Sequence, residues 1–493
     1  MRISVLLKSL FCNPTEVCYY FSRNGAQIIM NPFITPTARA KFIFLLLFVL
    51  VAQGQGTTVD VKKSAKSKWE PLEAQTVSGL TGFSYAPEHL NKYGSLAAKS
   101  ADATHFYRVQ KNPNGRWIIL DPDGCRNVQI VVCSVSIGKS PTMTRSYQEL
   151  FASSDEQWMR ATGKLFLDWG FNGCGAWSDA DAIRDYNRAA TTPLSYSVNL
   201  NMMATYGKKR GGTYQLPGNT GYPNQCIFVF DPAFETFCEE HAKSIVQYKD
   251  DPNLLGWFSD NEMPLGNKNL EGYLTLADTN DFGRVAAEKW LKTRGVSRDK
   301  ITDADKEAFA GFVAERYYRI VSSAIKRHDP NHLYIGSRLH GANKRHQPIL
   351  DAAARYCDII SINWYGEWTP KDETLACVEK AGKPFMVTEF YTKAMDAGLA
   401  NTAGAGWIVR TQKDRGLAYQ NFCLRMLKSK ACVGWHFFKY QDNDPEAKGV
   451  DPSNTDANKG LVNNKFIPYL PLGVEMKTLN QAVYQLQNYF DRH

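Results

Sequence analysis

Two glutamates each close a mostly apolar segment of the sequence. Glu262 follows the run from Leu254 to Phe258 after three polar residues, and Glu389 lies near the end of the run from Lys383 to Phe390. Apolar runs of this length are typical of strands that are buried on both faces, as in a parallel sheet. Catalytic residues of parallel barrels lie at the carboxyl ends of the strands. The sequence therefore predicts that both carboxyl groups lie on one face of the fold.

A pair of carboxyl groups is what the hydrolysis of a glycosidic bond requires. One group protonates the departing oxygen, and the other acts at the anomeric carbon. A separation of about 5 Å indicates retention of configuration and one of about 6.5 to 9.5 Å indicates inversion, and the sequence alone leaves this choice open. An isolated glutamate is most often a solvated surface charge, so the prediction depends on the equivalent positions of Glu262 and Glu389.

Strands and helices alternate along the chain from residue 128 onward. The clearest helix is Asp303 to Arg327, with Thr302 or Asp303 as its cap. Eight segments are predicted to be strands: Val128–Ile137, Gly170–Trp177, Leu194–Asn199, Leu254–Phe258, Leu333–Ser337, Tyr356–Tyr365, Lys383–Phe390 and Cys432–Tyr440. The other helices are predicted at Ser153–Asp168, Phe234–Tyr248 and Gln412–Leu427. This order predicts an α/β fold, a (β/α)₈ TIM barrel, in which Glu262 and Glu389 follow the fourth and seventh strands.

A short β-hairpin extension is predicted ahead of the barrel. The segment from His105 to Asp121 contains two alternating runs that are joined by Asn112 to Gly115, a strong turn signal. The polar stretch from Gln55 to Lys68 is expected to be flexible. We therefore divide the exported chain into a lead-in over residues 55–104 and a glycoside hydrolase catalytic domain over residues 105–493.

The stretch from Phe42 to Val51 is apolar but too short, at ten residues, to cross a bilayer of about 30 Å. Arg39 and Lys41 precede it and small residues follow it, which is the pattern of a cleaved signal peptide. We expect a signal peptide over residues 30–54 that begins at Met30, and an upstream extension over residues 1–29 that is not translated in the cell. The protein is then exported, to the periplasm or the medium, with no membrane attachment after cleavage.

Composition and charge exclude several classes of function. The net charge of +9 falls to +5 when five basic residues and one acidic residue of the first 54 are removed, and no basic run is present, so nucleic acid is not indicated. The 11 cysteines include no C-x-x-C pair and no Cys/His cluster, so no metal site is predicted. Nine cysteines remain after export; this odd number implies at least one free thiol, and no disulfide is assigned.

Five segments of the sequence, in order, resemble the β-agarases of glycoside hydrolase family 50, which belongs to clan A of the retaining glycosidases. The resemblance covers roughly Phe106 to Asp444. The five segments are Asp168–Asp179, Gly256–Glu262, Val387–Tyr391, Gly404–Arg415 and Val433–Asp442.

The resemblance implies roles for four residues near the strand ends. Glu262 matches the general acid/base, Glu389 the nucleophile, and Asn261 the asparagine that binds the 2-hydroxyl of the attacked sugar. Tyr365 falls where many clan members have a tyrosine that donates a hydrogen bond to the nucleophile. The resemblance thus implies a retaining hydrolase of β-galactosidic linkages in agarose or a related galactan, which needs neither a metal nor an organic cofactor.

Aromatic and polar residues near strand ends are candidates for substrate binding. Four tryptophans are predicted as platforms for sugar rings: Trp177, Trp364, Trp407 and Trp435. A single tryptophan is more often part of a core, and we assign Trp169 and Trp257 there. Polar residues that either bind the substrate or brace their neighbours are Asn199, Arg338, His340, Asn363, His436, Gln441 and Asp442. The loop from Tyr391 to Arg410 is expected to cover the site.

Two alternatives to a β-galactan hydrolase remain open. One is hydrolysis of another β-linked polysaccharide, for example a sulfated one. The other is a catalytically silent, carbohydrate-binding barrel, which the loss of either glutamate would indicate. Both Glu262 and Glu389 are present, so this second alternative is disfavoured.

Overall fold

The structure is a computed structural model that describes residues 19–22, 25–28, 56–210 and 221–493. The chain divides into two compact units, Met1–Gly56 and Thr57–His493. In the first unit, β1 (Tyr19–Ser22) pairs antiparallel with β2 (Gly25–Ile28). The expected signal peptide over residues 30–54 lies outside the described residues, as does most of the expected upstream extension. Among the described residues, no helix combines the length and the apolar character needed to cross a membrane.

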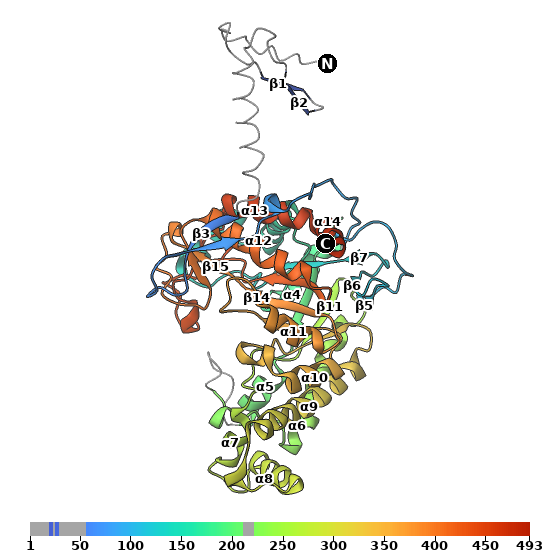
Figure 1. The fold of residues 1–493 in the computed structure, drawn as a ribbon, viewed down its shortest axis with the longest axis vertical. Helices are drawn as coiled ribbons and strands as arrows, with labels where there is room; N and C mark the ends of the chain where they lie inside the picture. Colours follow the sequence, from blue (N-terminus) through green and yellow to red (C-terminus); the bar gives the residue numbers. More distant parts are fainter. Residues whose placement is uncertain (1–18, 23–24, 29–55, 211–220) are drawn as a thin grey trace, which may run out of the picture. The chain divides into compact units, whose positions relative to one another are not determined.

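The second unit contains an eight-stranded parallel barrel, so the predicted (β/α)₈ TIM barrel is confirmed (Figure 1). A parallel bridge joins Leu339, three residues after one outer strand of the sheet, to Ile362 in the other outer strand, and so nearly closes the barrel. Glu262 follows the fourth strand and Glu389 lies in the seventh. In chain order the barrel strands are β8 (Gln129–Val132), β9 (Gly173–Cys174), β10 (Ser195–Asn199), β11 (Leu254–Phe258), β12 (Leu333–Gly336), β13 (Ile360–Asn363), β14 (Phe385–Phe390) and β17 (Cys432–Phe437).

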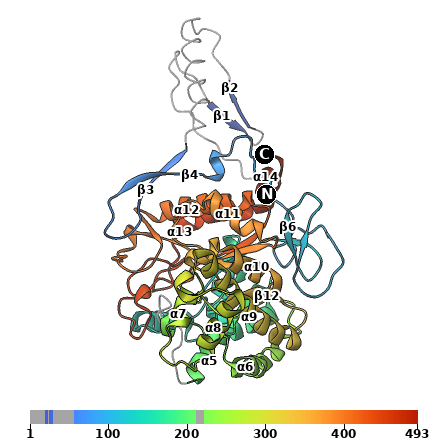
Figure 2. The same cartoon turned by 60° about the horizontal axis from the view of Figure 1, so that its bottom comes forward.

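Helices follow the barrel strands and cover the outside of the barrel. The long helix α9 (Asp303–His328) begins with a capping box between Thr302 and Asp305 and packs beside α10 (Gln347–Tyr356) (Figures 1 and 2). The predicted helix from Phe234 to Tyr248 is α-helical only to Ala242 and continues as a 3₁₀ turn. The other helices are α2 (Pro141–Phe151), α3 (Asp155–Asp168), α4 (Ala180–Ala189), α5 (Met202–Lys209), α6 (Pro232–Ala242), α7 (Lys268–Leu274), α8 (Phe282–Arg294), α11 (Asp372–Lys380), α12 (Gln412–Lys428), α13 (Leu470–Gln481) and α14 (Val483–Arg492).

The predicted hairpin is confirmed, and it fills the end of the barrel at which the strands begin. It consists of β5 (Arg108–Lys111) and β6 (Trp117–Leu120), and β7 (Arg126–Asn127) extends its sheet. Tyr107 and Ile119 belong to the buried cluster that also contains interior side chains of the strands, such as Leu255 of β11. The end of the barrel opposite the carboxyl ends of the strands is therefore packed with apolar side chains rather than open to water.

The last helix anchors this hairpin. The fully buried guanidinium of Arg116 donates to the carboxylate of Asp491 in α14, with a closest distance of 2.7 Å. The hydroxyl of Tyr484 donates to the carbonyl oxygen of Gly94 at 2.7 Å, and that of Tyr489 donates to the carbonyl oxygen of Thr81 at 3.0 Å. The end of the chain thus holds the segment that precedes the first barrel strand.

The prediction of a flexible stretch from Gln55 to Lys68 is wrong, because β3 (Thr57–Lys62) lies within it. β3 pairs with β4 (Glu70–Ala74) and with β16 (Trp407–Val409), which in turn pairs with β15 (Thr392–Ala394) (Figure 1). The loop that we expected to cover the site therefore contains two short strands. Val59 and Val61 lie on the same face of β3, and this face is buried against the loop.

Candidate active site

A cavity of about 420 Å³ opens at the carboxyl ends of the barrel strands. Glu262 and Glu389, which are separated by more than a hundred residues in sequence, both line it. The remaining lining residues are Ser134, Trp177, Asn261, His340, Tyr365, Tyr391, Ala405, Phe438, Lys439, Asp451, Ser453, Asn454 and Lys459. The strand ends therefore bring the two predicted carboxyl groups into one space, as their positions in the sequence indicated.

Glu389 is buried and surrounded by hydrogen-bond donors. The guanidinium of Arg338 donates to Oε1, which also accepts from the indole of Trp177 at 3.3 Å. The hydroxyl of Tyr365 donates to Oε2 at 2.8 Å. Burial raises the pKa of Glu389, Arg338 opposes this rise, and the nearby Glu262 adds to it. Arg338 and the two neutral donors thus stabilise the ionised form of a carboxyl group whose burial favours the protonated form.

Glu262 lies in a more open environment. Its carboxylate accepts a hydrogen bond of 2.8 Å from the amide of Asn363, and Nδ1 of His340 lies 3.3 Å from Oε1. No arginine or lysine forms an ion pair with Glu262 among the described residues. The two glutamates therefore share one cavity but differ in their partners: a cation holds Glu389, and an amide and an imidazole surround Glu262.

Asn363, at the end of β13, links the two sides of the site. Its amide nitrogen donates to Oδ1 of Asn261 at 3.1 Å as well as to Glu262. The side-chain Oδ1 of Asn363 accepts a hydrogen bond of 2.9 Å from the hydroxyl of Thr388, the residue directly before Glu389. Asn363 is fully buried. We infer that it orients Glu262 and Asn261 rather than contacting a substrate, which departs from its predicted place among the binding residues.

Non-glycine residues with positive φ follow each of the first five barrel strands. Their φ angles lie between 50° and 65°, and they are Ser134, Trp177, Asn201, Glu262 and Arg338. This left-handed conformation is unfavourable for residues with a side chain and costs about 1–3 kcal/mol for each. Trp177 and Arg338 donate hydrogen bonds to Glu389, and Glu262 is itself one of the two glutamates in the cavity. The strain is thus concentrated where the chain must turn side chains toward the cavity.

Asp260, which the sequence analysis did not single out, anchors the segment that carries Asn261 and Glu262. It is fully buried and accepts hydrogen bonds from the backbone of Met203 at 2.9 Å and from the hydroxyl of Tyr317 at 2.6 Å. Burial raises the pKa of Asp260 to about 7, although these bonds oppose the rise. The turn after β11 is therefore fixed to α5 and α9 from behind the cavity.

Six of the predicted site residues line the cavity, and two lie directly behind it. The lining residues are Trp177, Asn261, Glu262, His340, Tyr365 and Glu389. Arg338 and Asn363 are buried and contact the glutamates from behind. Trp177 is 40% exposed, as a sugar platform would be.

The predicted platforms Trp364 and Trp435 are wrong, because both side chains belong to the core. Trp364 is 1% exposed, and its indole donates to Glu367 at 3.0 Å. Trp435 is 0% exposed and donates to the hydroxyl of Tyr419 in α12 at 2.7 Å. Neither ring has a face that a sugar can reach. Trp169 and Trp257 are buried, as predicted.

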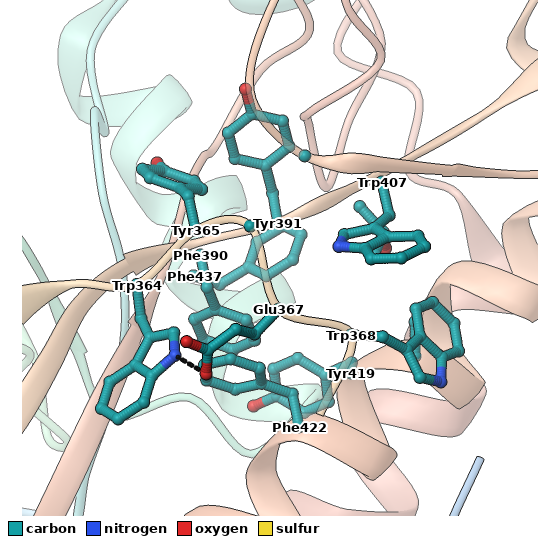
Figure 3. A pocket seen from close by; sticks show the side chains of 14 residues that line it. Trp364, Tyr365, Glu367, Trp368, Phe390, Tyr391, Trp407, Tyr419, Phe422 and Phe437 are labelled. Atoms are coloured by element: carbon teal, nitrogen blue, oxygen red, sulfur yellow. Dashed lines mark hydrogen bonds between the residues drawn. The ribbon is translucent and has the colours of Figure 1, made fainter. Parts of the chain in front are cut away.

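Trp407 lies in a second, aromatic pocket rather than in the cavity (Figure 3). This pocket lies behind Tyr365 and Tyr391, and the ring of Trp368 packs edge-on against Trp407 with centroids 5.9 Å apart. Its volume of about 20 Å³ is room for about one water molecule. It is too small for a sugar, and the half-buried Trp407 does not line the cavity that holds the glutamates, so its role as a platform stays a prediction.

Four of the predicted polar residues do not reach the cavity. Asp442 accepts from Asn458, Gly460 and Tyr469, and its neighbour Gln441 donates to a backbone carbonyl, so both brace the loop after β17. His436 is buried inside the barrel, where burial lowers its pKa and keeps it neutral. Asn199 is partly exposed, but its amide atoms are buried and lack partners.

The cavity residues on the side of the eighth strand are not among the predicted site residues. Lys439 follows β17 as Glu262 follows β11, so the same strand-end pattern points to it. Tyr391 comes two residues after Glu389 and lines the same cavity. Asp451, Ser453 and Asn454 come from a loop with no sequence signal of its own.

No family model matches the sequence. β-Agarase B of Vibrio sp. (strain JT0107) is 25% identical over 384 residues, which cover 70% of this chain and 38% of that protein. β-Agarase A of the same strain is 28% identical over 383 residues, which cover 67% of this chain and 36% of that protein. The chain thus matches little more than a third of the length of these curated relatives. The crystal structure of BpGH50 has a TM-score of 0.79 and 33% identity, and the match covers 89% of this chain and 96% of that one.

Proposed function

This chain belongs to glycoside hydrolase family 50, and from that premise we propose that it is a retaining glycosidase of clan A that cleaves β-galactosidic linkages of agarose or a related galactan. One observation carries the proposal: a single cavity at the strand ends holds two glutamates with different partners. A carboxylate paired with Arg338 suits a nucleophile, and a carboxyl group without a cationic partner suits a proton donor.

In the first step, the carboxylate of Glu389 attacks the anomeric carbon while the bond to the leaving oxygen breaks. Glu262, as the carboxylic acid, gives its proton to that oxygen, and a glycosyl ester forms on Glu389. Tyr365 and Trp177 hold the attacking carboxylate in place through their hydrogen bonds. Asn261 lies beside Glu262 in the cavity, where it is available to the 2-hydroxyl of the attacked sugar.

In the second step, Glu262 is a carboxylate and removes a proton from water. The water oxygen attacks the anomeric carbon, the ester bond breaks, and Glu389 is released as a carboxylate. Two displacements at one carbon restore the original configuration. Asn363 contributes by donating to Glu262 in the state that accepts the proton.

The choice of agarose rests on the two curated relatives, both of which are named β-agarases. The matching test is the size of the oligosaccharides released from agarose, porphyran and carrageenan, with Glu389→Ala as the blank. Release from agarose supports the proposal. Release from none of the three polysaccharides by the native protein contradicts it.

The roles of the two glutamates can be separated by chemical rescue with azide. Glu389→Ala and Glu262→Ala should each lower kcat by several orders of magnitude. With a dinitrophenyl β-galactoside, which needs no proton, Glu262→Ala should still form the glycosyl ester, and azide should release a β-galactosyl azide. Glu389→Ala should instead yield the α-galactosyl azide, because azide then takes the place of the nucleophile. Normal turnover of either variant, or the reverse anomers, would reject the assignment.

We also propose that the protein is exported through the segment at residues 30–54. Sequencing of the mature protein should find an N-terminus close to Gln55. An N-terminus upstream of Met30 would refute both the signal peptide and the expected initiator.

A further inference from the structure

We propose that Lys439 and Lys459 form a subsite for a sulfate ester on the galactan, so that a sulfated chain rather than neutral agarose is the preferred substrate. This inference rests on the proposed function, because it assigns a substrate feature to the same cavity. It concerns the side of the cavity that β17 and the following loop provide.

Lys439 supplies a cation without a partner. It lies two residues after the end of β17, is half-buried and lines the same cavity as Glu389. Within the part of the chain that the structure describes, its ammonium has no hydrogen-bond acceptor and no ion-pair partner. A partly desolvated charge without a partner is unfavourable, and a bound anion would offset that penalty.

Lys459 is held in place beside it. Its Nζ donates to the carbonyl oxygen of Ser453 and to Oδ1 of Asn454, both at 2.8 Å. It also lies 4.8 Å from the ring centroid of Tyr391 and 5.5 Å from that of Phe438. These neighbours fix the ammonium at the cavity wall but carry no charge.

The acidic groups around the two lysines have other partners or lie beyond ion-pair distance. Glu389 pairs with Arg338, and Asp442 is held by Asn458, Tyr469 and the backbone of Gly460. Asp451 lines the cavity and weakly favours the charge on Lys459, but it caps a turn by accepting from the backbone of Ser453. No carboxylate lies within 4.0 Å of either ammonium in the described residues.

The pKa shifts of Lys439 and Lys459 agree with two ammonium groups that lack counter-ions. Burial lowers the pKa of Lys439 to about 8, and burial together with the charge of Lys439 lowers the pKa of Lys459 to about 7. Lys393, a third nearby cation, also contributes to this, but it donates to Ala403 and Gly404 in the loop and does not line the cavity. An anion between Lys439 and Lys459 would favour the charged form of both.

A sulfate ester fits this subsite better than a sugar hydroxyl does. A hydroxyl accepts a hydrogen bond but brings no negative charge, whereas a sulfate presents three acceptor oxygens and a full charge. A charge-assisted hydrogen bond is worth about 10- to 100-fold in affinity. The proposal therefore predicts a preference of that size for a sulfated substrate over its desulfated counterpart.

The experiment measures kcat/KM on sulfated galactan oligosaccharides, on the same material after chemical desulfation, and on a pyruvylated oligosaccharide that carries a carboxylate instead. For the native protein, the ratio of sulfated to desulfated kcat/KM should be about 10 to 100 and should fall as salt rises. Lys439→Met should bring this ratio close to one, and Lys439→Arg should restore most of it. Lys477→Met, which removes an exposed lysine from α13, serves as the matched control and should keep the native ratio.

The outcomes separate the two proposals. If the dinitrophenyl β-galactoside and all oligosaccharides are left intact, the proposed function itself fails. If neutral oligosaccharides are cleaved and the native ratio is one or less, only the sulfate subsite is overturned. A preference for the pyruvylated substrate that exceeds that for the sulfated one overturns the choice of sulfate. A ratio that Lys439→Met leaves unchanged overturns the assignment of Lys439.

Discussion

Arg338 is the residue whose removal gives the most informative prediction, because opposite pH trends are expected for activity and stability. In Arg338→Met the buried carboxyl group of Glu389 loses its cation but keeps its bonds from Tyr365 and Trp177. Burial then raises the pKa of Glu389 without the opposing charge. Since the nucleophile must be ionised, the acid limb of the kcat/KM profile should move to higher pH. Loss of a positioned charged donor should lower kcat/KM by about 10²- to 10³-fold at neutral pH.

The stability of Arg338→Met should fall as pH rises, whereas its activity should rise with pH. The pKa of Glu389 in the folded protein is raised above its unfolded value, so the stability that the neutral form contributes is present at low pH and lost as pH rises through the folded pKa. Above that pH the variant contains an unpaired buried carboxylate, at a cost of about 3–5 kcal/mol. A unit of about 440 residues loses about 1 °C in Tm for each kcal/mol. The variant should thus melt about 3–5 °C below the native protein at pH values above the pKa of Glu389 and close to it at pH values below that pKa.

The assays are a pH series of kcat/KM with an aryl β-galactoside and thermal melts at the same pH values. Arg338→Lys keeps a cation and should leave the acid limb near its native place even if activity falls. Tyr365→Phe removes only a neutral donor, so it should move the limb in the same direction by less. An acid limb that stays in place in Arg338→Met, together with a Tm deficit that does not depend on pH, would refute this account of Glu389.

Three further predictions follow from the burial and capping of particular residues. Trp364→Ala should lower the free energy of unfolding by about 3–5 kcal/mol, because the ring of Trp364 is in the core. Trp177→Ala should instead lower kcat/KM by about tenfold or more and leave Tm within about 1 °C of the native value. The reverse pattern in thermal melts and kinetics would place Trp364 in the site. Thr411→Ala removes the capping box of α12 and should cost about 1 kcal/mol, which denaturant titration would detect. Burial raises the pKa of Asp260 to about 7, so ionisation of Asp260 should remove stability as pH rises toward and through 7; Asp260→Asn should flatten this part of the stability profile, and an unchanged slope would contradict the assignment.

The positions of the two glutamates could be predicted from sequence because the signal is local. Each follows a run of apolar residues, and the carboxyl ends of parallel strands all meet at one face. Lys439 has a similar position after β17, but a lysine has no role in a mechanism of two carboxyl groups, so a search for carboxyl groups does not find it. The strand-end pattern therefore indicates polar cavity residues of any kind, and not carboxyl groups alone.

The tryptophan predictions failed because a fully apolar strand gives no sign of which residues point inward. In β17, Trp435 points outward to α12 and His436 points inward to Phe258. The residues on both sides of this pair are apolar, so the sequence does not show which of the two faces the interior. The position of β3 was missed for another reason. Val61 pairs with Val409 across almost 350 residues, and no pattern within residues 55–68 reports a partner so far away.

The attachment of α14 to the hairpin has a consequence for the way the molecule acquires its structure. Asp491 and Tyr489 contact residues that are 375 and 408 positions earlier in the chain. Contacts between such distant positions form slowly, because a long loop must close before they are gained. The hairpin at the base of the barrel therefore gains these supports only when α14 is available. A nascent chain that still lacks α14 would keep that apolar base unsupported, and docking of α14 would be a late step of folding.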